Sequence, residues 1–447
     1  MYPSYFKTSI AIAAATITVA ACALPGDASM GPVASPPETM GPNPRLPPVE
    51  KNLVPTVQIS PAKGWPAGAK PAAANGVAVN AFAVGLNHPR WIYVLPNGDV
   101  LVAETNAPPK PDDGNGIRGK VMKFVQGRAG AGTPTANRIV LLRDVNGDGV
   151  AETKTVFIDN LNSPFGMALV GSDLYVADTD AILKFPYVTG QTSVGVKGVK
   201  IADLPAGPIN HHWTKNIIAS VDGRKLYATA GSNSNVGENG MAAEEGRAAI
   251  HEVDIASGTQ RLFATGLRNP NGMAWEPGTG ALWTVVNERD ELGNDLVPDY
   301  LTSVKQGAFY GWPHSYFGQH VDVRVNPPRP DLVTKAISPD YALGAHVAPL
   351  GLVAAGKTSL PAPFSNGMFV GEHGSWNRKP QVGYKVVFVP FASGKPSGLP
   401  IDVLSGFVNA QGEANGRPVG VAIDGKGALL VADDVGNVIW RAVGTTP

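Results

Sequence analysis

Two adjacent histidines occur in the segment "INHHWTKN", which spans residues 209–216. Histidine changes its charge near neutral pH, so His211 or His212 could serve as a general base, and imidazole is also a metal ligand. A histidine on its own is more often a hydrogen-bonded structural side chain. The pair therefore gives two candidates for chemistry and no reason, by itself, to choose between them.

Several other loops carry cations beside asparagine, tryptophan or proline. Their sequences are "GLRNPNG", "VVNERD", "HGSWNRK" and "NGRPVG", and their cations are Arg268 (next to Asn269), Arg289, Arg378 with Lys379, and Arg417. The forked guanidinium group can bind both oxygens of a carboxylate at once. If these loops meet in space, we expect them to bind an anionic ligand.

A third candidate site is the segment "DVNGDGVAE", residues 144–152, which begins like a calcium-binding loop. Asp144, Asn146 and Asp148 place oxygen atoms at positions 1, 3 and 5, and a glycine follows at position 6. Position 12 lacks the usual glutamate, so Glu152 at position 9 is the nearby acid. A structural calcium site and a metal-free Asx turn both remain open for this loop.

The elements that must position these residues follow a repeated pattern. Six segments each contain an apolar strand, a tight turn and a second apolar strand, and they span residues 89–105, 164–185, 216–232, 270–288, 349–374 and 418–442. Asn-Gly and Asp-Gly pairs in them suit hairpin turns, and the chain as a whole has 53 Gly and 40 Pro. The pattern predicts an all-β protein, a six-bladed β-propeller with four-stranded antiparallel blades in residues 77–447. The alternative is a β-sandwich of unrelated hairpins.

Propeller geometry also predicts where the candidate residues lie. The histidine and arginine segments stand at equivalent points of their repeats, close to the first strand. Loops at that point of each blade converge at one mouth of the central channel. We therefore expect the histidine pair to face the arginines across a funnel, with the choice between His211 and His212 still open.

The N-terminal region has the character of an export signal followed by a linker. The apolar run "SIAIAAATITVA" after Lys7 has the length of a signal-peptide core, and "VAAC" at its end resembles a bacterial lipobox. That resemblance implies cleavage after residue 21 and lipidation of Cys22, although an ordinary secretory signal remains the alternative. Residues 22–76 are rich in Pro, Ala and Gly, which favours an extended tether. We expect an exported, membrane-tethered lipoprotein, periplasmic or at the cell surface.

Charge excludes one class of partner. The chain has 36 Lys+Arg and 36 Asp+Glu residues and no basic run, so no net field attracts nucleic acid.

The segments "GLRNPNGMAWEP", "FYGWP", "HWTKN" and "RPVGVAIDGKGALLVADD" are similar to those of the soluble sugar dehydrogenases that depend on pyrroloquinoline quinone (PQQ), in the branch of the L-sorbosone dehydrogenase-like proteins. The similarity extends over nearly all of residues 77–443. It implies an enzyme that oxidises an aldose or a sugar aldehyde, uses PQQ and Ca²⁺, and passes electrons to a respiratory quinone or cytochrome. The calcium ion would polarise the quinone as a Lewis acid.

The same resemblance implies roles for individual residues. His212 would take the proton from the sugar hydroxyl while hydride moves to PQQ. The residues in contact with PQQ would be Arg268, Asn269, Arg417, either Arg378 or Lys379, and Trp376 over the face of the ring system. The backbone carbonyls of Arg289 and Asp290 would hold the calcium ion.

Two other functions remain open at this point. Six-bladed lactonases also hold Ca²⁺ in the channel, but with acidic and asparagine side chains, and the arginine-rich loops argue against that class. A non-catalytic propeller that binds a protein partner would have no need of a histidine opposite a ring of cations.

Overall fold

The computed structural model of the protein describes residues 32–50, 56–109 and 127–445. The expected signal peptide, residues 1–21, and Cys22 lie outside the described residues, so their roles stay predictions. Within the described ranges, no helix has both the length and the apolar character needed to cross a membrane.

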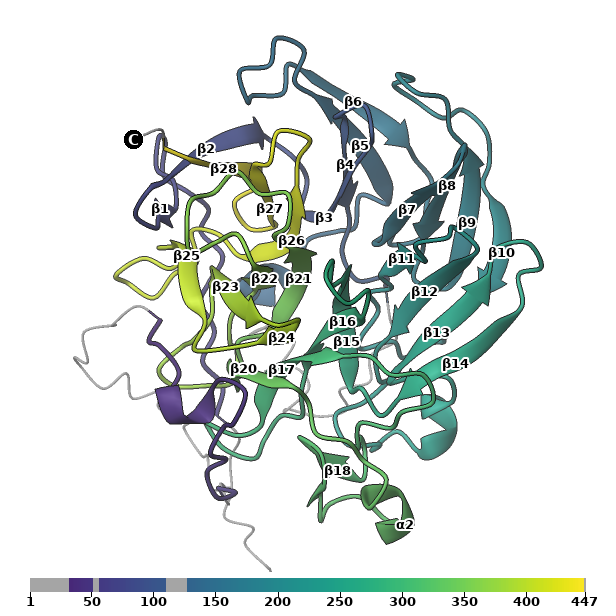
Figure 1. The fold of residues 1–447 in the computed structure, drawn as a ribbon, viewed down its shortest axis with the longest axis vertical. Coiled ribbons are helices and arrows are strands. Elements are labelled where there is room, and N and C mark those ends of the chain that lie inside the picture. The colour runs from purple at the N-terminus through teal and green to yellow at the C-terminus, as the bar shows by residue number, and fades with distance from the viewer. Residues whose placement is uncertain (1–31, 51–55, 110–126, 446–447) are drawn as a thin grey trace, which may run out of the picture.

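The chain folds as a six-bladed β-propeller, which confirms the prediction (Figure 1). Each blade is an antiparallel sheet whose first strand lies innermost. Blade 1 contains β3 (Pro89–Val94), β4 (Val100–Glu104), β5 (Arg138–Arg143) and β6 (Thr153–Ile158). Blade 2 contains β7 (Met167–Val170), β8 (Asp173–Ala177), β9 (Ala181–Pro186) and β10 (Val199–Asp203). Blade 3 contains β11 (Ile217–Ala219), β12 (Lys225–Ala230), β13 (Ala249–Asp254) and β14 (Gln260–Thr265).

Among the last three blades, blade 5 has two additional strands and blade 6 takes its outer strand from the N-terminal side. Blade 4 contains β15 (Asn269–Trp275), β16 (Leu282–Asn287), β17 (Pro298–Ser303) and β20 (Tyr341–Ala345). Blade 5 contains β21 (Pro349–Ala354), β22 (Gly367–Glu372), β23 (Lys385–Ala392) and β25 (Ile401–Ser405), to which β1 (Ala72–Ala73) and β24 (Lys395–Pro396) are added. Blade 6 contains β26 (Pro418–Ile423), β27 (Leu429–Asp433), β28 (Val438–Gly444) and β2 (Val77–Val84).

The ring closes in blade 6, because its outer strand comes from the other end of the domain. β2 pairs with β28 over seven residue pairs, from Val77 with Gly444 to Val84 with Val438. Side by side in Figure 1, these strands have opposite ends of the colour scale. Closure of this kind leaves no open edge between the first and last blades.

Small residues on the inner strands allow the blades to approach the channel axis closely. A Cβ atom placed on Gly272 would lie 2.6 Å from the backbone nitrogen of Leu352 on the neighbouring inner strand, and one on Gly420 would lie 2.8 Å from the carbonyl oxygen of Arg90. Only glycine fits so close an approach. The repeated Pro-x-Gly order in the sequence therefore marks the start of an inner strand.

The core lies between neighbouring blades rather than at the centre of the ring. One row of aromatic side chains crosses the first three blades, with Trp91 and Phe165 ring centres 4.8 Å apart and Phe165 and Trp213 ring centres 5.9 Å apart. Trp213, at one end of this row, directly follows the histidine pair in sequence. Its packing therefore fixes the backbone that carries His212.

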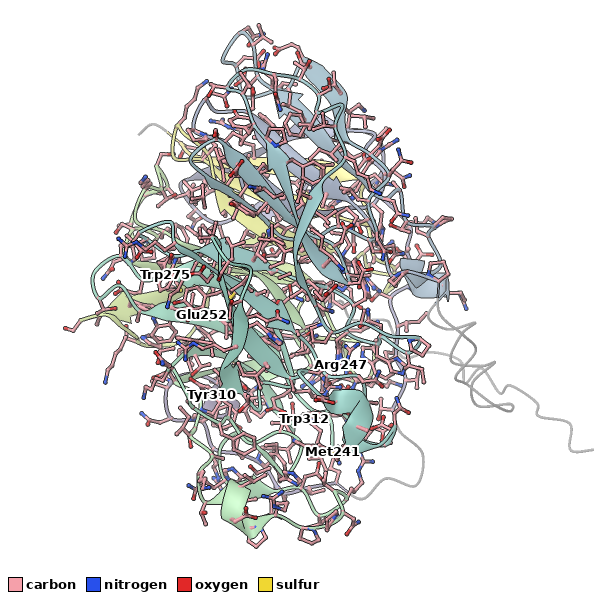
Figure 2. The ribbon with its side chains drawn as sticks, turned by 90° about the vertical axis from the view of Figure 1, so that its right-hand side faces the viewer. Met241, Arg247, Glu252, Trp275, Tyr310 and Trp312 are labelled. Atoms are coloured by element: carbon pink, nitrogen blue, oxygen red, sulfur yellow. The ribbon has the colours of Figure 1, made fainter. Side chains whose placement is uncertain are left out.

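Short helical turns and a hairpin occur in the connections between strands. They are η1 (Pro37–Thr39), η2 (Gly127–Ala131), η3 (Met241–Glu244), α2 (Pro330–Val333) and the hairpin of β18 (Ser315–Tyr316) with β19 (His320–Val321). Figure 2 shows Trp312 beside the loop that carries Met241 and Arg247, and the Trp312 indole Nε1 donates to the carbonyl of Asn235 at 2.9 Å. Trp312 is therefore buried between parts of two blades.

The N-terminal region differs from a free tether in its described parts. The backbone of Gly41 pairs with Ala342 in β20, and β1 adds to blade 5. Between them, Trp65 inserts its indole between Phe407 and Trp440, with ring centres 5.4 Å apart in both pairs. Composition predicted an extended tether, and within the described residues 32–50 and 56–76 this segment makes these contacts along the propeller surface.

Candidate active site

One mouth of the propeller channel opens into a cavity of about 440 Å³. The loops that precede the inner strands contribute to its wall, together with the N-terminal segment, as propeller geometry predicted. Its polar and aromatic wall residues include His88, Arg90, His211, His212, Trp213, Arg268, Asn269, Asn287, Glu288, Asp290, Asp299, His346, His373, Trp376, Asn377, Arg417 and Asp434. A cavity of this size suits a small organic ligand.

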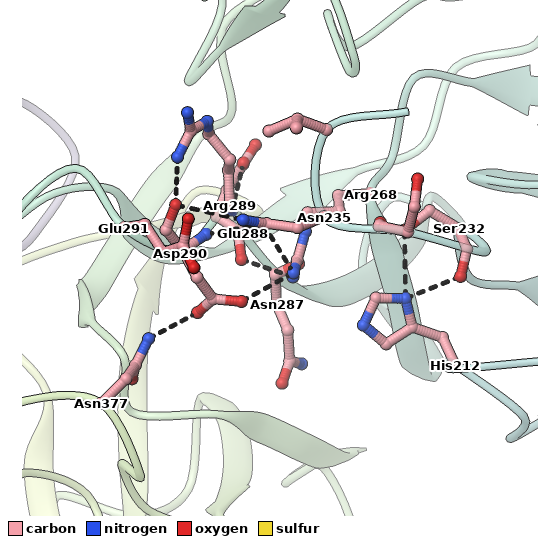
Figure 3. A network of polar contacts seen from close by, with 12 residues as sticks. His212, Ser232, Asn235, Arg268, Asn287, Glu288, Arg289, Asp290, Glu291 and Asn377 are labelled. Carbon is pink, nitrogen blue, oxygen red and sulfur yellow. Dashed lines mark hydrogen bonds and ion pairs between the residues drawn. The ribbon is translucent and has the colours of Figure 1, made fainter. Parts of the chain in front are cut away.

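His212 presents one ring nitrogen to this cavity and hides the other. Its Nδ1 lies 2.8 Å from the carbonyl oxygen of Ser232, which can only accept, so Nδ1 carries the proton. The lone pair is then on Nε2, and Figure 3 shows this second nitrogen on the side facing Asn287 and Asp290. Burial, and next the charge of Arg268, lower the pKa of His212 well below its ordinary value. His212 is thus a neutral imidazole with a free lone pair at pH 7.

Arg268 and Asp290 form a buried pair opposite His212 (Figure 3). The Arg268 Nη2 lies 2.7 Å from an Asp290 carboxylate oxygen, and Asn377 donates to the other oxygen at 2.7 Å. Burial alone would raise the pKa of Asp290, but Arg268 and His346 outweigh it and lower that pKa. Asp290 is therefore ionised, and it fixes the guanidinium of Arg268 at the cavity wall.

A second charged cluster, around Asp434, was not predicted from the sequence. Arg90 Nη1 lies 2.8 Å and His373 Nε2 2.9 Å from the same Asp434 oxygen, while His88 Nδ1 contacts the Asp434 backbone carbonyl at 3.1 Å. Burial raises the pKa of Asp434, but His373, His88 and Arg90 together lower it below its ordinary value. The segment "NHPR" at the start of β3 stands at the same repeat position as the loops of Arg268 and Arg417. This equivalence is the sequence feature from which Arg90 could have been placed at the cavity.

Arg417 is the cavity arginine without an acidic partner. No carboxylate of the described residues lies within ion-pair distance of it, and its Nε is buried without a hydrogen-bond partner. Its Nη2 donates to the Ser60 carbonyl at 2.9 Å, and its guanidinium lies 5.3 Å from the ring centre of Tyr384. A buried cation whose direct contacts are a carbonyl and an aromatic ring is suited to bind an anion.

Two predicted arginines do not reach the cavity. The Arg378 guanidinium, expected to contact PQQ, donates to the carbonyl of Asn294 at 2.9 Å and pairs with Asp295 at 2.6 Å. Arg289 forms a buried ion pair with Asp322. Lys379 is also absent from the cavity wall, whereas Trp376 and Asn377 of the same loop line it. Both guanidinium groups hold loops in place. The structure therefore does not agree with the prediction that the Arg378 and Arg289 side chains bind a ligand in the cavity.

The predicted calcium site at Arg289 and Asp290 does not fit the arrangement of donors. The Asp290 carbonyl already accepts from the guanidinium of Arg289, and the carbonyl of Glu288 accepts from Arg268 at 2.5 Å. A calcium ion on the predicted Asp290 carbonyl would displace the Arg289 guanidinium or lie beside it, which like-charge repulsion opposes.

The 144–152 loop brings its acids together, but it also holds a lysine. Ligand oxygens of Asp144, Asp148 and Glu152 lie within 4.8 Å of one another. Lys426 donates to the carbonyl of Gly147 at 2.8 Å and lies 3.5 Å from Asp144. The Asp144 carboxylate also accepts from two backbone N–H groups of the loop, as in an Asx turn. Calcium binding here stays a prediction.

Acidic residues at the ends of second strands hold the cavity loops. Glu104 accepts from the backbone N–H of Asn87 at 2.7 Å, Asp178 from that of Asn162 at 2.9 Å, and Asp433 from that of Arg417 at 2.8 Å. Each acid binds the loop that enters the inner strand of its own blade. This repeated contact explains why irregular loops keep one conformation around the cavity.

The sequence of this chain matches the model of one protein family. The TrAA12-like family model matches residues 135–306 and 331–442, well over half of the chain. The chain belongs to the TrAA12-like family.

Solved structures similar to this TrAA12-like chain share its fold. A calcium structure of a Trichoderma reesei protein of Carbohydrate-Active Enzymes Family AA12 aligns with a TM-score of 0.67 and 18% identity, over 87% of this chain and 99% of that one. The PQQ domain of the pyranose dehydrogenase from Coprinopsis cinerea, in its holo form, aligns with a TM-score of 0.65 and 20% identity, over 86% and 100%. At such identities the similarity supports the propeller fold.

Two curated relatives are similar in sequence. An uncharacterized protein of Borreliella burgdorferi is 28% identical over 63% of this chain and 76% of its own length. The PQQ-dependent pyranose dehydrogenase of Coprinopsis cinerea is 26% identical over 71% of this chain, a match that spans 44% of that enzyme. The TrAA12-like chain therefore corresponds to less than half of the fungal enzyme.

Proposed function

We propose that this TrAA12-like protein is a PQQ-dependent oxidoreductase that oxidises a sugar or a sugar-derived aldehyde. The names of its relatives support the cofactor and the substrate class. The cavity supports the reaction type, because it joins a neutral base, His212, with buried cations that suit an anionic cofactor. The L-sorbosone-like specificity that the sequence suggested is part of this proposal.

The main support for an anionic cofactor is the buried guanidinium of Arg417. A buried guanidinium without a carboxylate partner is costly, and a ligand carboxylate would compensate its charge. PQQ has three carboxylate groups. Arg268 and Asn269 are two further candidates to hold it, since Arg268 Nε and Asn269 Oδ1 are both buried without hydrogen-bond partners. Trp376 lines the same cavity and offers a flat surface to a planar ring.

His212 would act as the base of the reaction. Its Nε2 accepts the proton of the reacting hydroxyl, either of a sugar or of a hydrated sugar aldehyde, as the C–H bond gives up its hydride. Bound PQQ would supply the acceptor for that hydride. The Ser232 carbonyl holds the proton on Nδ1 and thereby keeps the lone pair on the reacting side. Arg268 opposes a lasting positive charge on His212, which favours release of the proton afterwards.

The substrate would enter beside the loop of residues 231–246. Its Asn235 side chain accepts from Arg268 Nη2 and from the Asp290 backbone, both at 3.0 Å, so this loop is attached to the cavity wall. A change at Asn235 would alter how Arg268 and Asp290 are held at the cavity wall, whereas Ser232 at the start of the loop contacts His212. We propose that the loop contributes to the choice among sugars.

The test is reconstitution of the purified apo-protein with PQQ, with and without Ca²⁺. PQQ binding is followed by its absorption, and turnover by dye reduction with aldoses, sorbosone and lactones as substrates. We expect a bound-quinone spectrum and dye reduction by at least one sugar or sugar aldehyde. Absence of both would exclude the proposal, and lactone hydrolysis without dye reduction would favour the lactonase alternative.

We also propose that the protein is exported and tethered through a lipid on Cys22, close to a respiratory quinone or cytochrome. The lipobox-like "VAAC" segment supports this proposal. Labelled palmitate should enter the wild-type protein and not a Cys22→Ser variant. Equal labelling of both would exclude a lipid at this position.

A further inference from the structure

An N-terminal segment, residues 58–65, runs across the loops that build one side of the cavity. We call these residues the strap. Ile59 is part of the cavity wall, and the Gln58 backbone N–H donates to the carbonyl of Trp376 at 2.8 Å. Ser60 is fully buried. The first part of the strap, residues 58–60, therefore lies at the cavity wall, whereas Ala62 and Lys63 are exposed.

The strap holds the guanidinium of Arg417. Arg417 Nη2 donates to the Ser60 carbonyl at 2.9 Å, and this bond lies within the buried part of the molecule. The Ser60 hydroxyl in turn accepts from Gln381 Nε2 at 3.2 Å, which ties the strap to blade 5. No carboxylate of the described residues pairs with Arg417. The Ser60 carbonyl is therefore a main determinant of the orientation of the Arg417 guanidinium.

The strap also holds the backbone of Arg417, through a carboxylate. Trp65 Nε1 donates to Asp433 Oδ2 at 2.7 Å, and Asp433 Oδ1 accepts from the Arg417 backbone N–H at 2.8 Å. A second indole, of Trp440, donates to the same Oδ2 at 3.0 Å. Arg417 is thus fixed at both ends, by Ser60 at the guanidinium and by the Trp65–Asp433 pair at the main chain.

We infer that the strap is a working part of the active site, in which Ser60 and Trp65 are positioning residues that orient Arg417 toward an anionic group of the bound cofactor. This inference rests on the proposed function for the identity of that group. It assigns a role to a segment whose composition resembles a linker. The strap does not react; it sets the place and direction of one charge.

The main test is Ser60→Trp, which inserts a large side chain at a fully buried position and pushes the carbonyl away from Arg417. The matched control is Ser35→Trp, because Ser35 is also a buried serine of the N-terminal region but packs against Gly344, away from the cavity. Binding of PQQ to each apo-protein is measured by equilibrium dialysis. We expect Ser60→Trp to raise the Kd roughly tenfold, the effect of one charge-assisted contact, and Ser35→Trp to leave it unchanged. Equal Kd values for the two variants would overturn the inference.

A double-mutant cycle separates positioning from general damage. In an Arg417→Gln background, Ser60→Trp should cause no further loss of PQQ affinity, because the charge that the strap orients is gone. An additive loss would show that Ser60 acts independently of Arg417. If Ser60→Trp does not fold, Trp65→Phe takes its place, with Trp440→Phe as the control, which removes an N–H from the same carboxylate at a residue outside the strap. Trp65→Phe must then raise the Kd more than Trp440→Phe; an equal or smaller effect contradicts the inference.

A readout without the cofactor distinguishes this inference from the proposed function. If the wild-type protein binds no PQQ, the proposed function fails, and hydrogen exchange still tests the strap. Ser60→Trp should accelerate exchange in residues 415–420, and Ser35→Trp should not. Unchanged exchange in Ser60→Trp would show that the strap does not hold the Arg417 loop.

Discussion

The carbonyl oxygen of Ser232 lies 2.8 Å from Nδ1 of His212, so a backbone group rather than a carboxylate orients the proposed base. Gly231, the residue before Ser232, makes this contact possible, because a Cβ atom there would collide with the Cβ of His212 and the Oδ1 of Asn269. A carbonyl fixes the tautomer without adding the negative charge that would raise the pKa of the ring. The Ser232 contact thus fixes the tautomer, while burial and then the charge of Arg268 lower the pKa of His212 well below its ordinary value.

Replacement of His212 should separate binding from turnover. We expect His212→Asn to lower kcat by roughly 10²- to 10⁴-fold, the usual contribution of a general base, while the Kd for PQQ stays within about threefold of the wild type. Stopped-flow dye reduction and equilibrium dialysis measure the two quantities. Ser232→Ala is the control: it keeps the carbonyl and should keep most of the activity. A fully active His212→Asn variant would show that another group takes the proton.

The pH profile should follow the low pKa of His212. Because burial and then Arg268 lower that pKa, the base is unprotonated well below pH 6.5, and kcat/KM should keep its plateau into mildly acidic solution. Arg268→Gln removes a nearby positive charge, so the His212 pKa should rise and the acidic limb should move to higher pH. The measurement is kcat/KM from pH 4 to 8 at saturating PQQ. A shift of that limb to lower pH would contradict the assignment.

Two buried arginines should respond differently to the same substitution. Arg417→Gln should weaken PQQ binding by at least about tenfold, since its guanidinium faces the cavity without an acidic partner. Arg378→Gln removes a contact to Asp295 outside the cavity, so it should lower the thermal midpoint and leave the Kd nearly unchanged. Equilibrium dialysis measures the Kd for PQQ of each variant, and thermal unfolding measures its thermal midpoint. A large rise in the Kd for PQQ in Arg378→Gln, with an unchanged Kd in Arg417→Gln, would instead indicate that Arg378 binds the cofactor.

Glu372 should limit stability in alkaline solution. Burial raises the pKa of this carboxyl to about 8, and its Oε2 has no hydrogen-bond partner. Its contribution to stability is present below the pKa of about 4.3 of the unfolded chain and is lost as the pH rises through 8. Glu372→Gln should therefore be more stable than the wild type at pH 9, on the order of a few kcal/mol, and similar at pH 5.

Glu104→Gln provides the contrast for this experiment. Glu104 ends the second strand of blade 1 as Glu372 does in blade 5, but it pairs with Arg138 at 2.5 Å. Its replacement should destabilise the protein at both pH values. Thermal midpoints of the three proteins at pH 5 and pH 9 test the prediction, and a wild type more stable than Glu372→Gln at pH 9 would contradict it.

Lys426 should compete with calcium for the 144–152 loop. Its ammonium donates to the Gly147 carbonyl and lies near Asp144, so calcium must displace it. We expect Lys426→Met to bind calcium more tightly than the wild type, as measured by calorimetric titration. Asp148→Asn in the Lys426→Met background should weaken that binding again. Equal affinity with and without Lys426 would show that the lysine does not occupy the site.

The parts of the structure that repeat could be predicted from the sequence. Six hairpin repeats, four of which begin with Pro-x-Gly, gave the propeller, its mouth and the candidates Arg268 and Arg417, while the family resemblance gave His212. Contacts between blades carry no such local signal. The cluster at Asp434 joins residues from three separate blades, and nothing near "NHPR" indicates that Arg90 meets an acid more than 300 positions away.

The two residues that the sequence misplaced show the same limit. Arg378 and Arg289 have the right residue type in the right loops, but an acid nearby, Asp295 or Asp322, binds each guanidinium outside the cavity. Side-chain direction depends on such partners rather than on loop position. Composition also cannot tell whether a Pro-rich segment is attached, which is why the strap was expected to be part of a linker.

The closure of blade 6 by β2 sets an order of assembly. The strands that receive the strap and β2 belong to blades 5 and 6, the last to be synthesised, while the strap and β2 themselves are among the first. Contacts between the ends of a chain form late, because a long loop must close before they are made. The cavity wall at Arg417 is therefore complete only when the whole domain exists. A chain that lacks either of these ends lacks the contacts that complete this wall.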